Sequence, residues 1–439
     1  MINFKVVLSP YFALLISLML ALLAVLPSDY FYRRNFAEKS LVTFSLPVLT
    51  WVAACSICYA FGLYFTGLFF GKKHNKSKTG VLQVEISDYR FRVILICLFA
   101  ILLNLYGLIQ LYKFFGFRGL LSAMVGIGDV DLRLAVYGAL KAVNTGWAIA
   151  FTVPVASVVF ITLIKTKDNI LKSLFIILLV IHTALILTTQ SKGPIFALVI
   201  SLVICMQMLR FPRLYISRKD ILKSVLISTL LVIVFLTIQY RRNPDILSLD
   251  GSYKEISAYT IVSYNRLAYL ISDKLQIPNM YMGFWTNRWF WGLPGEQYSN
   301  YLLSRAQFDI PYNAFAAWLD TFRAVNSAGL NDKYIWITIY GEVFADYRWF
   351  GFIWFFIYGV GSRIAYEDMK RGHLRSYAVY PFVLQCNFGW YSGATIGTRS
   401  ILFCVLIALY LSLRTVNFPG ILRNGQQKQI YVECETGEK

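Results

Sequence analysis

The chain has 439 residues, of which 57% are hydrophobic and only 15% are charged, with a net charge of +19 and a mean hydropathy of +0.57. So few charges cannot cover a water-soluble surface of this size, and apolar runs long enough to cross about 30 Å of hydrocarbon recur along the chain. The composition therefore excludes soluble, fibrous and disulfide-scaffold proteins, and the length of the runs excludes an outer-membrane barrel. We expect an all-α polytopic membrane protein.

About ten spanning helices are expected from the apolar runs. In chain order, the predicted ranges are 6–27, 41–71, 93–114, 145–164, 173–190, 194–209, 221–240, 348–366, 377–393 and 401–413. The stretch 115–144 mixes apolar residues with glycine and acidic residues, which favours an interfacial or re-entrant element. The stretch 241–346 is too long for a simple connector, and within it 263–275 and 312–322 have the spacing of short amphipathic helices on the membrane surface.

Charge patterning predicts the topology. Lys and Arg gather in the connecting stretches 72–78, 165–168, 210–220 and 367–375. Because these residues accumulate in cytoplasmic loops, both termini are placed in the cytoplasm. The net positive charge of the chain is then explained by its topology, and no nucleic-acid partner is needed to explain it. The predicted parts are an N-terminal bundle of about seven spans at 1–240, a large external loop at 241–346, C-terminal transmembrane helices at 347–414 and a cytoplasmic tail at 415–439.

Histidine is scarce, with three residues in the chain. His74 and His373 fall in predicted cytoplasmic loops, and His182 falls in the fifth predicted span, so neither large external segment contains a histidine. A histidine-ligated metal or a histidine general base on the outer face is therefore disfavoured. We expect neither a metal nor a cofactor, and we expect His182 to be a buried hydrogen-bonding residue rather than a catalyst.

Several basic residues lie on the predicted outer face, at the ends of spans or within the two external segments, against the orientation rule. They are Arg133, Lys192, Arg241, Arg266, Arg348 and Arg399. Arginine presents a permanently charged fork that binds phosphate oxygens, so the group favours an anionic lipid headgroup such as a diphosphate. The alternative for each residue is that it anchors the chain to lipid phosphates. Lipid anchoring is the favoured interpretation for Arg241 together with Arg242.

Two carboxylates are candidates for a general base. Glu342 and Asp346 are spaced i and i+4 in the stretch 341–351, which places them on one face of a helix entering the membrane. Facing a cavity, such a group would deprotonate a substrate hydroxyl. The alternatives are that Glu342 is a first-turn acid favoured by the helix dipole and that Asp346 pairs with Arg348 or another cation.

The stretch that carries Glu342 and Asp346, the region around Arg133 and the region around Lys192 resemble parts of the Wzy-type O-antigen polymerases. Those proteins join oligosaccharide repeat units in bacterial inner membranes. The stretch LTTQSKGPIFALVI (187–200) is similar to that family's polar hairpin with a basic residue and a glycine, although Lys192 stands where the family more often has Arg. The stretch GEVFADYRWFG (341–351) resembles the family's Gly-Glu, aromatic start of a late span. The region around Arg133 resembles its arginine-bearing first external segment.

The resemblance implies a metal-independent glycosyltransferase of the GT-C type with a periplasmic active site. Such polymerases transfer the growing glycan from undecaprenyl diphosphate to the non-reducing end of an incoming lipid-linked unit. The six outer cations would then hold the diphosphate leaving group, and Glu342 or Asp346 would take the acceptor proton. The implied partners are the lipid-linked oligosaccharide, membrane lipids, a chain-length regulator and a repeat-unit flippase.

Other functions are open to a chain of this architecture. An O-antigen ligase uses the same donor and transfers the glycan to lipid A-core, but ligases carry a histidine in the long external loop and 241–346 has none. The same absence disfavours a membrane acyltransferase. A lipid-linked oligosaccharide flippase or transporter would be expected to show paired repeats and ionisable groups near the midplane, whereas here the charges gather at the ends of spans.

Overall fold

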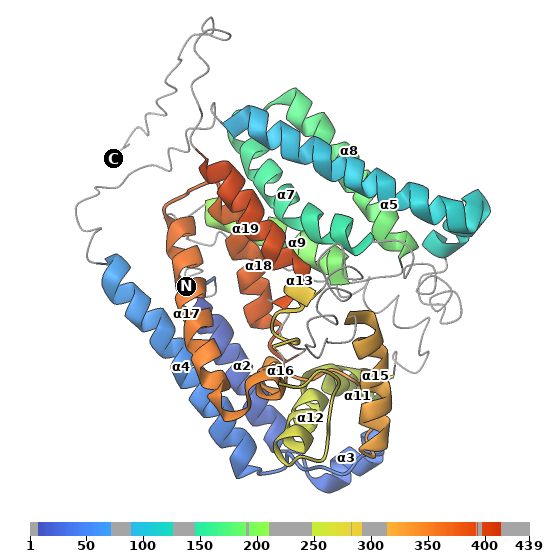
Figure 1. Ribbon diagram of the computed structural model, residues 1–439, viewed down its shortest axis with the longest axis vertical. Helices are drawn as coiled ribbons and strands as arrows, with labels where there is room; N and C mark the ends of the chain where they lie inside the picture. The colour runs from blue at the N-terminus through green and yellow to red at the C-terminus, as the bar shows by residue number, and fades with distance from the viewer. Residues whose placement is uncertain are drawn as a thin grey trace, which may run out of the picture.

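The computed structural model describes residues 8–71, 89–125, 145–189, 193–209, 248–281, 283–291, 314–391, 393 and 397–413. Within these ranges the regular secondary structure is helical and no strand occurs, which confirms the predicted all-α class (Figure 1). The predicted span 221–240 lies outside the described residues, as do parts of the two large external segments.

Each predicted span inside the described residues contains a helix. These helices are α2 (Pro10–Val25), α4 (Leu46–Gly71), α5 (Arg90–Val125), α7 (Thr145–Thr166), α8 (Asn169–Thr188), α9 (Gly193–Leu209), α17 (Gly351–Lys370), α18 (Ser376–Phe388) and α19 (Arg399–Ser412). By length and composition, four of the described helices can cross a membrane, namely α4, α5, α7 and α8, and α2 with α3 forms a fifth candidate. These helices fit a membrane-embedded protein, while the count of ten spans and the GT-C arrangement stay predictions.

The chain turns sharply after α2. The helix α3 (Asp29–Phe36) is bent by 93° from α2, and it lies beside α12 and α15 at one end of the molecule (Figure 1). Ser28 has extended backbone, with ψ of 162°, which ends the helical run, and its Oγ starts α3 by accepting a hydrogen bond from Phe31 N at 3.3 Å. The segment 28–36 is therefore separate from the predicted first span.

The third predicted span is longer than expected. Helix α5 continues from Arg90 to Val125 and changes direction at Gly116, whose φ is 63°. Residues 116–125 fall in the predicted external element at 115–144, and after the non-helical Gly116 they form a second helical segment beyond the kink. The rest of that element lies outside the described residues.

The large external loop contributes short helices. They are α11 (Leu249–Thr260), α12 (Val262–Ile271), α13 (Arg288–Trp291), α15 (Ala314–Ser327), α16 (Ile339–Tyr347) and the 3-10 turn η4 (Arg348–Phe350). Helices fall on both predicted amphipathic stretches. However, α12 is buried at every position from Val262 to Leu270, because it packs against α2, α4 and α16. It is thus part of the core rather than a helix lying on the membrane surface.

Two apolar cores hold the helices together. One is formed by side chains of α2, α3, α4, α12, α16 and α17, and the other by side chains of α5, α7, α8, α9, α18 and α19 together with the end of α17. Helices α17 and α18 pack against each other and against α2. These two helices therefore connect the two cores. The residues that join α18 to α19 consequently lie between the two cores.

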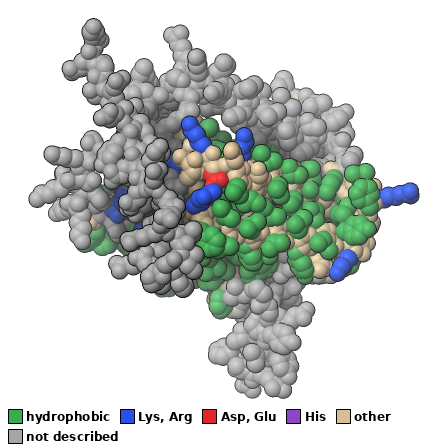
Figure 2. Space-filling model, turned by 90° about the horizontal axis from the view of Figure 1, so that it is seen from above, with side chains coloured by type: hydrophobic (Ala, Val, Ile, Leu, Met, Phe, Trp, Pro, Cys, Tyr) green, Lys and Arg blue, Asp and Glu red, His purple; other side chains and the backbone are tan. Residues whose placement is uncertain are grey.

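The outer surface of the spans is apolar. Figure 2 shows one face over α5 and α8 covered with hydrophobic side chains, with Lys and Arg toward its ends. Leu102 and Val180 on this pair of helices are 62% and 64% exposed. Contiguous exposure of such large apolar side chains is expected where lipid replaces water as the solvent.

A fully buried ion pair joins α12, a helix of the large external loop, to the residues that follow α3. The guanidinium of Arg266 on α12 and the carboxylate of Glu38, just after α3, are both 0% exposed. Arg266 Nη1 donates to Glu38 Oε2 at 2.8 Å and Nη2 donates to Asn331 O at 2.9 Å, while Glu38 Oε1 accepts from Asn331 N at 2.9 Å. Three segments distant in sequence are therefore joined at one charged contact.

A polar contact also lies inside the second core. His182 Nδ1 on α8 lies 2.9 Å from Asn104 Oδ1 on α5, and Asn104 Nδ2 donates to Thr152 Oγ1 on α7 at 2.7 Å. His182 is 0% exposed. The prediction that this histidine is a buried hydrogen-bonding residue is confirmed.

Breaking the Glu38–Arg266 pair is expected to destabilise the fold strongly. Arg266→Met or Glu38→Met alone leaves one charge buried without its partner, which costs about 3–5 kcal/mol. The double variant Glu38→Met/Arg266→Met removes both charges and should unfold at a higher temperature than either single variant. Thermal unfolding of the purified protein in detergent measures this cycle. If the stability loss of the double variant equals the sum of the losses of the two single variants, the two side chains are not coupled and the prediction is wrong.

Candidate active site

The six predicted cations do not share one environment. Arg133, Lys192 and Arg241 lie outside the described residues. Among the described ones, Arg266 is enclosed by Glu38 and Asn331, so the geometry favours a structural role for it. Arg348 Nη1 pairs with Asp273 at 2.8 Å, and its guanidinium also binds the Tyr281 hydroxyl. Arg399 lines the apolar cavity described below.

The two predicted carboxylates lie together on α16. Thr338 begins this helix, since its Oγ1 accepts a hydrogen bond from Gly341 N at 3.1 Å. Glu342 stands in the first turn, where the helix dipole favours an acid. Asp346 follows one turn later on the same face. Both side chains are buried, with 5% and 4% exposure.

Asp346 is held by the backbone of the segment before α13. Its Oδ2 accepts from Thr286 N and Thr286 Oγ1, each at 2.8 Å, and its Oδ1 accepts from Trp285 N at 3.3 Å. Burial raises the pKa of Asp346 to about 6, and the hydrogen bonds from Thr286 partly oppose this rise. The carboxylate thus fixes the position of residues 285–286 relative to α16.

Glu342 pairs with a residue that sequence reasoning did not select. Arg288 Nη2, at the start of α13, lies 3.2 Å from Glu342 Oε2 and 3.3 Å from Oε1. Arg288 stands within the aromatic stretch YMGFWTNRWFWG (281–292). Because Asp346 anchors Trp285 and Thr286, it also sets the place of Arg288 two residues later. In the sequence, the only feature that could have singled out Arg288 was its position as a cation within an aromatic cluster.

Two described glycines between α18 and α19 lie directly against Glu342 and against the segment that Asp346 holds. Gly393 has φ of +127°, and a Cβ there would lie 2.8 Å from Glu342 Oε1. A Cβ at Gly397 would overlap Thr286 O. Only glycine allows the backbone to approach the carboxylate cluster this closely. Trp390 O, at the start of the connection, also accepts from Ile339 N at 2.8 Å, so the connection is bonded to the beginning of α16.

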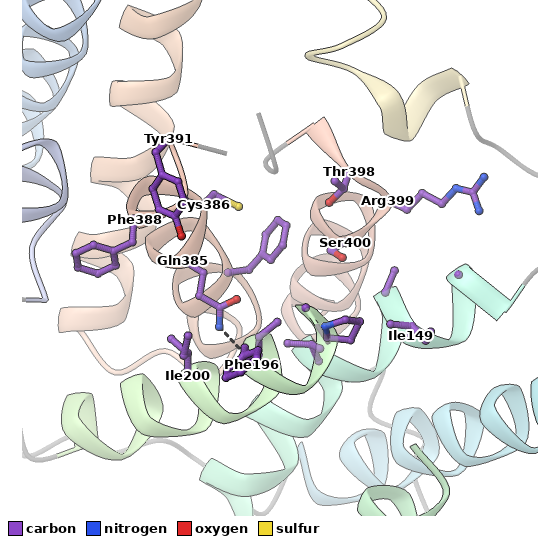
Figure 3. Close-up of a pocket in the computed structure, with 18 residues that line it drawn as sticks. Ile149, Phe196, Ile200, Gln385, Cys386, Phe388, Tyr391, Thr398, Arg399 and Ser400 are labelled. Carbon is purple, nitrogen blue, oxygen red and sulfur yellow. Dashed lines mark hydrogen bonds between the residues drawn. The ribbon is translucent and has the colours of Figure 1, made fainter. Parts of the chain in front are cut away.

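An apolar cavity of about 700 Å³ lies on the other side of this connection. Its walls come from the first turns of α7 and α9, the last turns of α18 and the start of α19 (Figure 3). Phe196, Ile149 and Ile200 line it, and Gln385 Nε2 crosses from α18 to donate to Ala197 O at 2.5 Å. A cavity of this size and polarity suits an apolar ligand.

The cavity and the carboxylate cluster are neighbours along the backbone. Tyr391 lines the cavity, and Gly393, two residues later, touches Glu342. Thr398 and Arg399 line the cavity directly after Gly397, which lies against Thr286. Since two residues span at most about 7 Å, the wall of the cavity and the Glu342 carboxylate lie close together.

Arg399 gives this cavity a charged rim. Its guanidinium lies 5.1 Å from the centroid of the Trp147 ring. Figure 3 shows its side chain extending outward past Thr398, toward α7 and away from Gln385. The cation therefore stands at the mouth of the cavity rather than on its floor.

Comparisons with known proteins give no family for this chain. No protein-family model, no curated protein and no solved structure matches it. The function therefore has to be argued from the site itself.

The assembled group brings apolar and charged surfaces together. It combines an apolar cavity, a cation at its rim and a second cation paired with a buried carboxylate. Arginines stabilise negative charge that develops on a leaving group, and a carboxylate accepts a proton. In the described part of the chain, no three His, Cys, Asp or Glu side chains gather as metal ligands.

The pKa of Asp346 predicts a pH dependence of stability. Its folded pKa of about 6 lies above the value of about 3.9 for an exposed Asp, so folding favours the protonated form. The free energy of unfolding should therefore fall as pH rises from about 4 to about 6, by roughly 3 kcal/mol at most, and then level off. In the Asp346→Asn variant this pH-dependent change in the free energy of unfolding should be absent. Melting temperatures of both proteins from pH 4 to 8 measure it, and parallel curves would contradict the assignment.

Gly393→Ala should disturb the site more than a substitution elsewhere. A methyl group at 393 meets the Glu342 carboxylate and strains a backbone with positive φ. We expect a melting temperature lowered by several degrees, and about tenfold lower activity in the transfer assay described below. Gly361→Ala is the matched control, because nothing lies within 4 Å of a Cβ there. Equal behaviour of the two variants would show that the close approach is unimportant.

Proposed function

We propose that this protein is an oligosaccharide repeat-unit polymerase of the bacterial inner membrane. In this proposal it transfers the growing glycan from undecaprenyl diphosphate to the non-reducing end of an incoming lipid-linked unit, on the periplasmic side. One observation carries the proposal: an apolar cavity with Arg399 at its rim adjoins a buried carboxylate paired with Arg288. This combination suits a substrate with an apolar chain, a diphosphate and a sugar hydroxyl.

The donor lipid would enter through the apolar cavity. Its polyprenyl chain would lie against side chains such as Phe196 and Ile200, and its diphosphate would reach the rim at Arg399. A guanidinium there stabilises the charge that develops as the diphosphate departs, most strongly where water is excluded. Arg133, Lys192 and Arg241 stay proposed ligands of the same diphosphate from segments outside the described residues. Arg266 and Arg348, which are engaged by Glu38 and Asp273, are left out of this group.

Glu342 is the proposed general base. The acceptor hydroxyl oxygen forms a bond to the anomeric carbon while the bond from that carbon to the diphosphate oxygen breaks, and the diphosphate leaves with the electron pair. The acceptor proton passes to Glu342, and the configuration at the anomeric carbon inverts. Asp346, whose oxygens already accept three hydrogen bonds from 285–286, acts as a positioning residue for Arg288.

The alternatives predict different products in cells. Loss of a polymerase should leave surface core carrying one repeat unit, whereas loss of an O-antigen ligase or a flippase should leave core with none. Deleting the gene in its own host and separating the surface lipopolysaccharide on a gel distinguishes these functions. Core without any repeat unit would overturn the polymerase proposal.

Glu342→Gln should reduce polymerisation by at least about 100-fold, because the amide cannot accept the proton. Arg399→Ala should cause a loss of similar size through the leaving group. Arg323→Ala is the matched control, since its side chain is 85% exposed on α15. The measurement is chain growth by purified protein given a defined lipid-linked repeat unit. Activity of Glu342→Gln equal to that of the control would remove Glu342 from the mechanism.

A further inference from the structure

The apolar cavity beside Arg399 contains one side-chain amide in a fixed orientation. Gln385 Nε2 on α18 donates to Ala197 O at 2.5 Å and to Ser201 Oγ at 2.7 Å, and both acceptors lie on α9. Because a backbone carbonyl accepts hydrogen bonds and cannot donate them, the nitrogen of the amide has to face α9. The amide oxygen is therefore turned away from that helix, and Figure 3 shows it facing the cavity.

This oxygen is an acceptor that the described part of the chain does not use. Gln385 makes the two bonds from its nitrogen, and its Oε1 accepts none from any described residue. Two hydroxyls that line the same cavity, those of Ser400 and Tyr391, likewise make no hydrogen bond with the described residues. A polar group against an apolar wall is costly to leave unpaired. A ligand that donates a hydrogen bond to Gln385 would remove this cost.

The interior of the cavity is uncharged. Among the described residues that line it, Arg399 is the one charged side chain, and it extends outward at the mouth (Figure 3). Deeper in the cavity the walls are aromatic and aliphatic, as at Phe196, Phe382 and Ile200. An ionised group beside Gln385 would find no opposite charge there, so a neutral polar group is favoured.

We infer that this cavity binds a neutral apolar alcohol, meaning an isoprenoid or acyl lipid that carries one free hydroxyl. The hydroxyl would donate to Gln385 Oε1 and accept from Ser400 or Tyr391, and the chain would lie against Phe196 and Ile200. A hydroxyl suits this set of groups better than an amide N–H, because it both donates and accepts. A volume of about 700 Å³ is within the range of pockets for small ligands.

The inference goes beyond the proposed function. The alcohol would occupy the space given above to the polyprenyl chain of the donor, so it would compete with that donor if the protein is a polymerase. Binding of the alcohol itself requires no glycan transfer. A failed binding test and a failed polymerisation test are therefore separate results.

Thermal unfolding of the full-length protein in an uncharged detergent tests the site. Farnesol at saturating concentration should raise the melting temperature by about 3 °C or more. Farnesyl methyl ether at the same concentration cannot donate to Gln385 and should raise it by less than about 1 °C. Dioctanoylglycerol carries a free hydroxyl on an acyl lipid, so a shift from it alone would assign the site to acylglycerols rather than isoprenoids. Equal shifts from farnesol and its methyl ether, or no shift from either alcohol, would overturn the inference.

A variant links this discrimination to the amide oxygen. Gln385→Met keeps an unbranched side chain of similar length and removes the acceptor, so farnesol and its methyl ether should then give the same shift. Gln207→Met is the matched control, because Gln207 lies on α9 and is not among the residues that line the cavity. It should keep the difference between the two compounds. Retention of that difference by Gln385→Met would overturn the inference, and if this variant fails to fold, the two compounds on the unaltered protein still decide.

Discussion

Two fully buried charges, Glu38 and Arg266, meet where the segment after α3 packs against α12. A buried charge is costly unless its partner and its hydrogen bonds are in place. Because each charge needs its partner, the ion pair holds α12 against the segment after α3. Helix α16 packs on α12, so the position of Glu342 depends on this contact. An ion pair outside the candidate site thus helps to set the geometry within it.

The candidate site is assembled through backbone more than through side chains. Asp346 binds two backbone amides at 285–286, and the Trp390 carbonyl binds the amide of Ile339. Gly393 lets the α18–α19 connection lie on the Glu342 carboxylate. This connection separates the carboxylates from the apolar cavity by one or two residues. A polar and an apolar compartment thereby share one wall.

Helices α18 and α19 carry a cavity at each end, and the two cavities differ in chemistry. The one beside Arg399 adjoins the buried carboxylates of Glu342 and Asp346. The one beside Arg375 has two carboxylates and two arginines on its wall, and basic side chains pair with both carboxylates. Both follow from the same physical rule, that charged groups gather at the ends of helices whose middle lies in hydrocarbon.

The sequence alone determined the helical class, the place of every described long helix and the pairing of Glu342 with Asp346 on one face, because hydrophobic run length and the 3.6-residue period are local properties. It also indicated that His182 would be buried. Only the tertiary structure decided which charges meet: Arg266 finds Glu38, and Arg288 finds Glu342, across 228 and 54 residues of chain. No local pattern encodes such partners, since they depend on how α3, α12, α13 and α16 pack. For the same reason the burial of α12 could not be predicted from its amphipathic spacing.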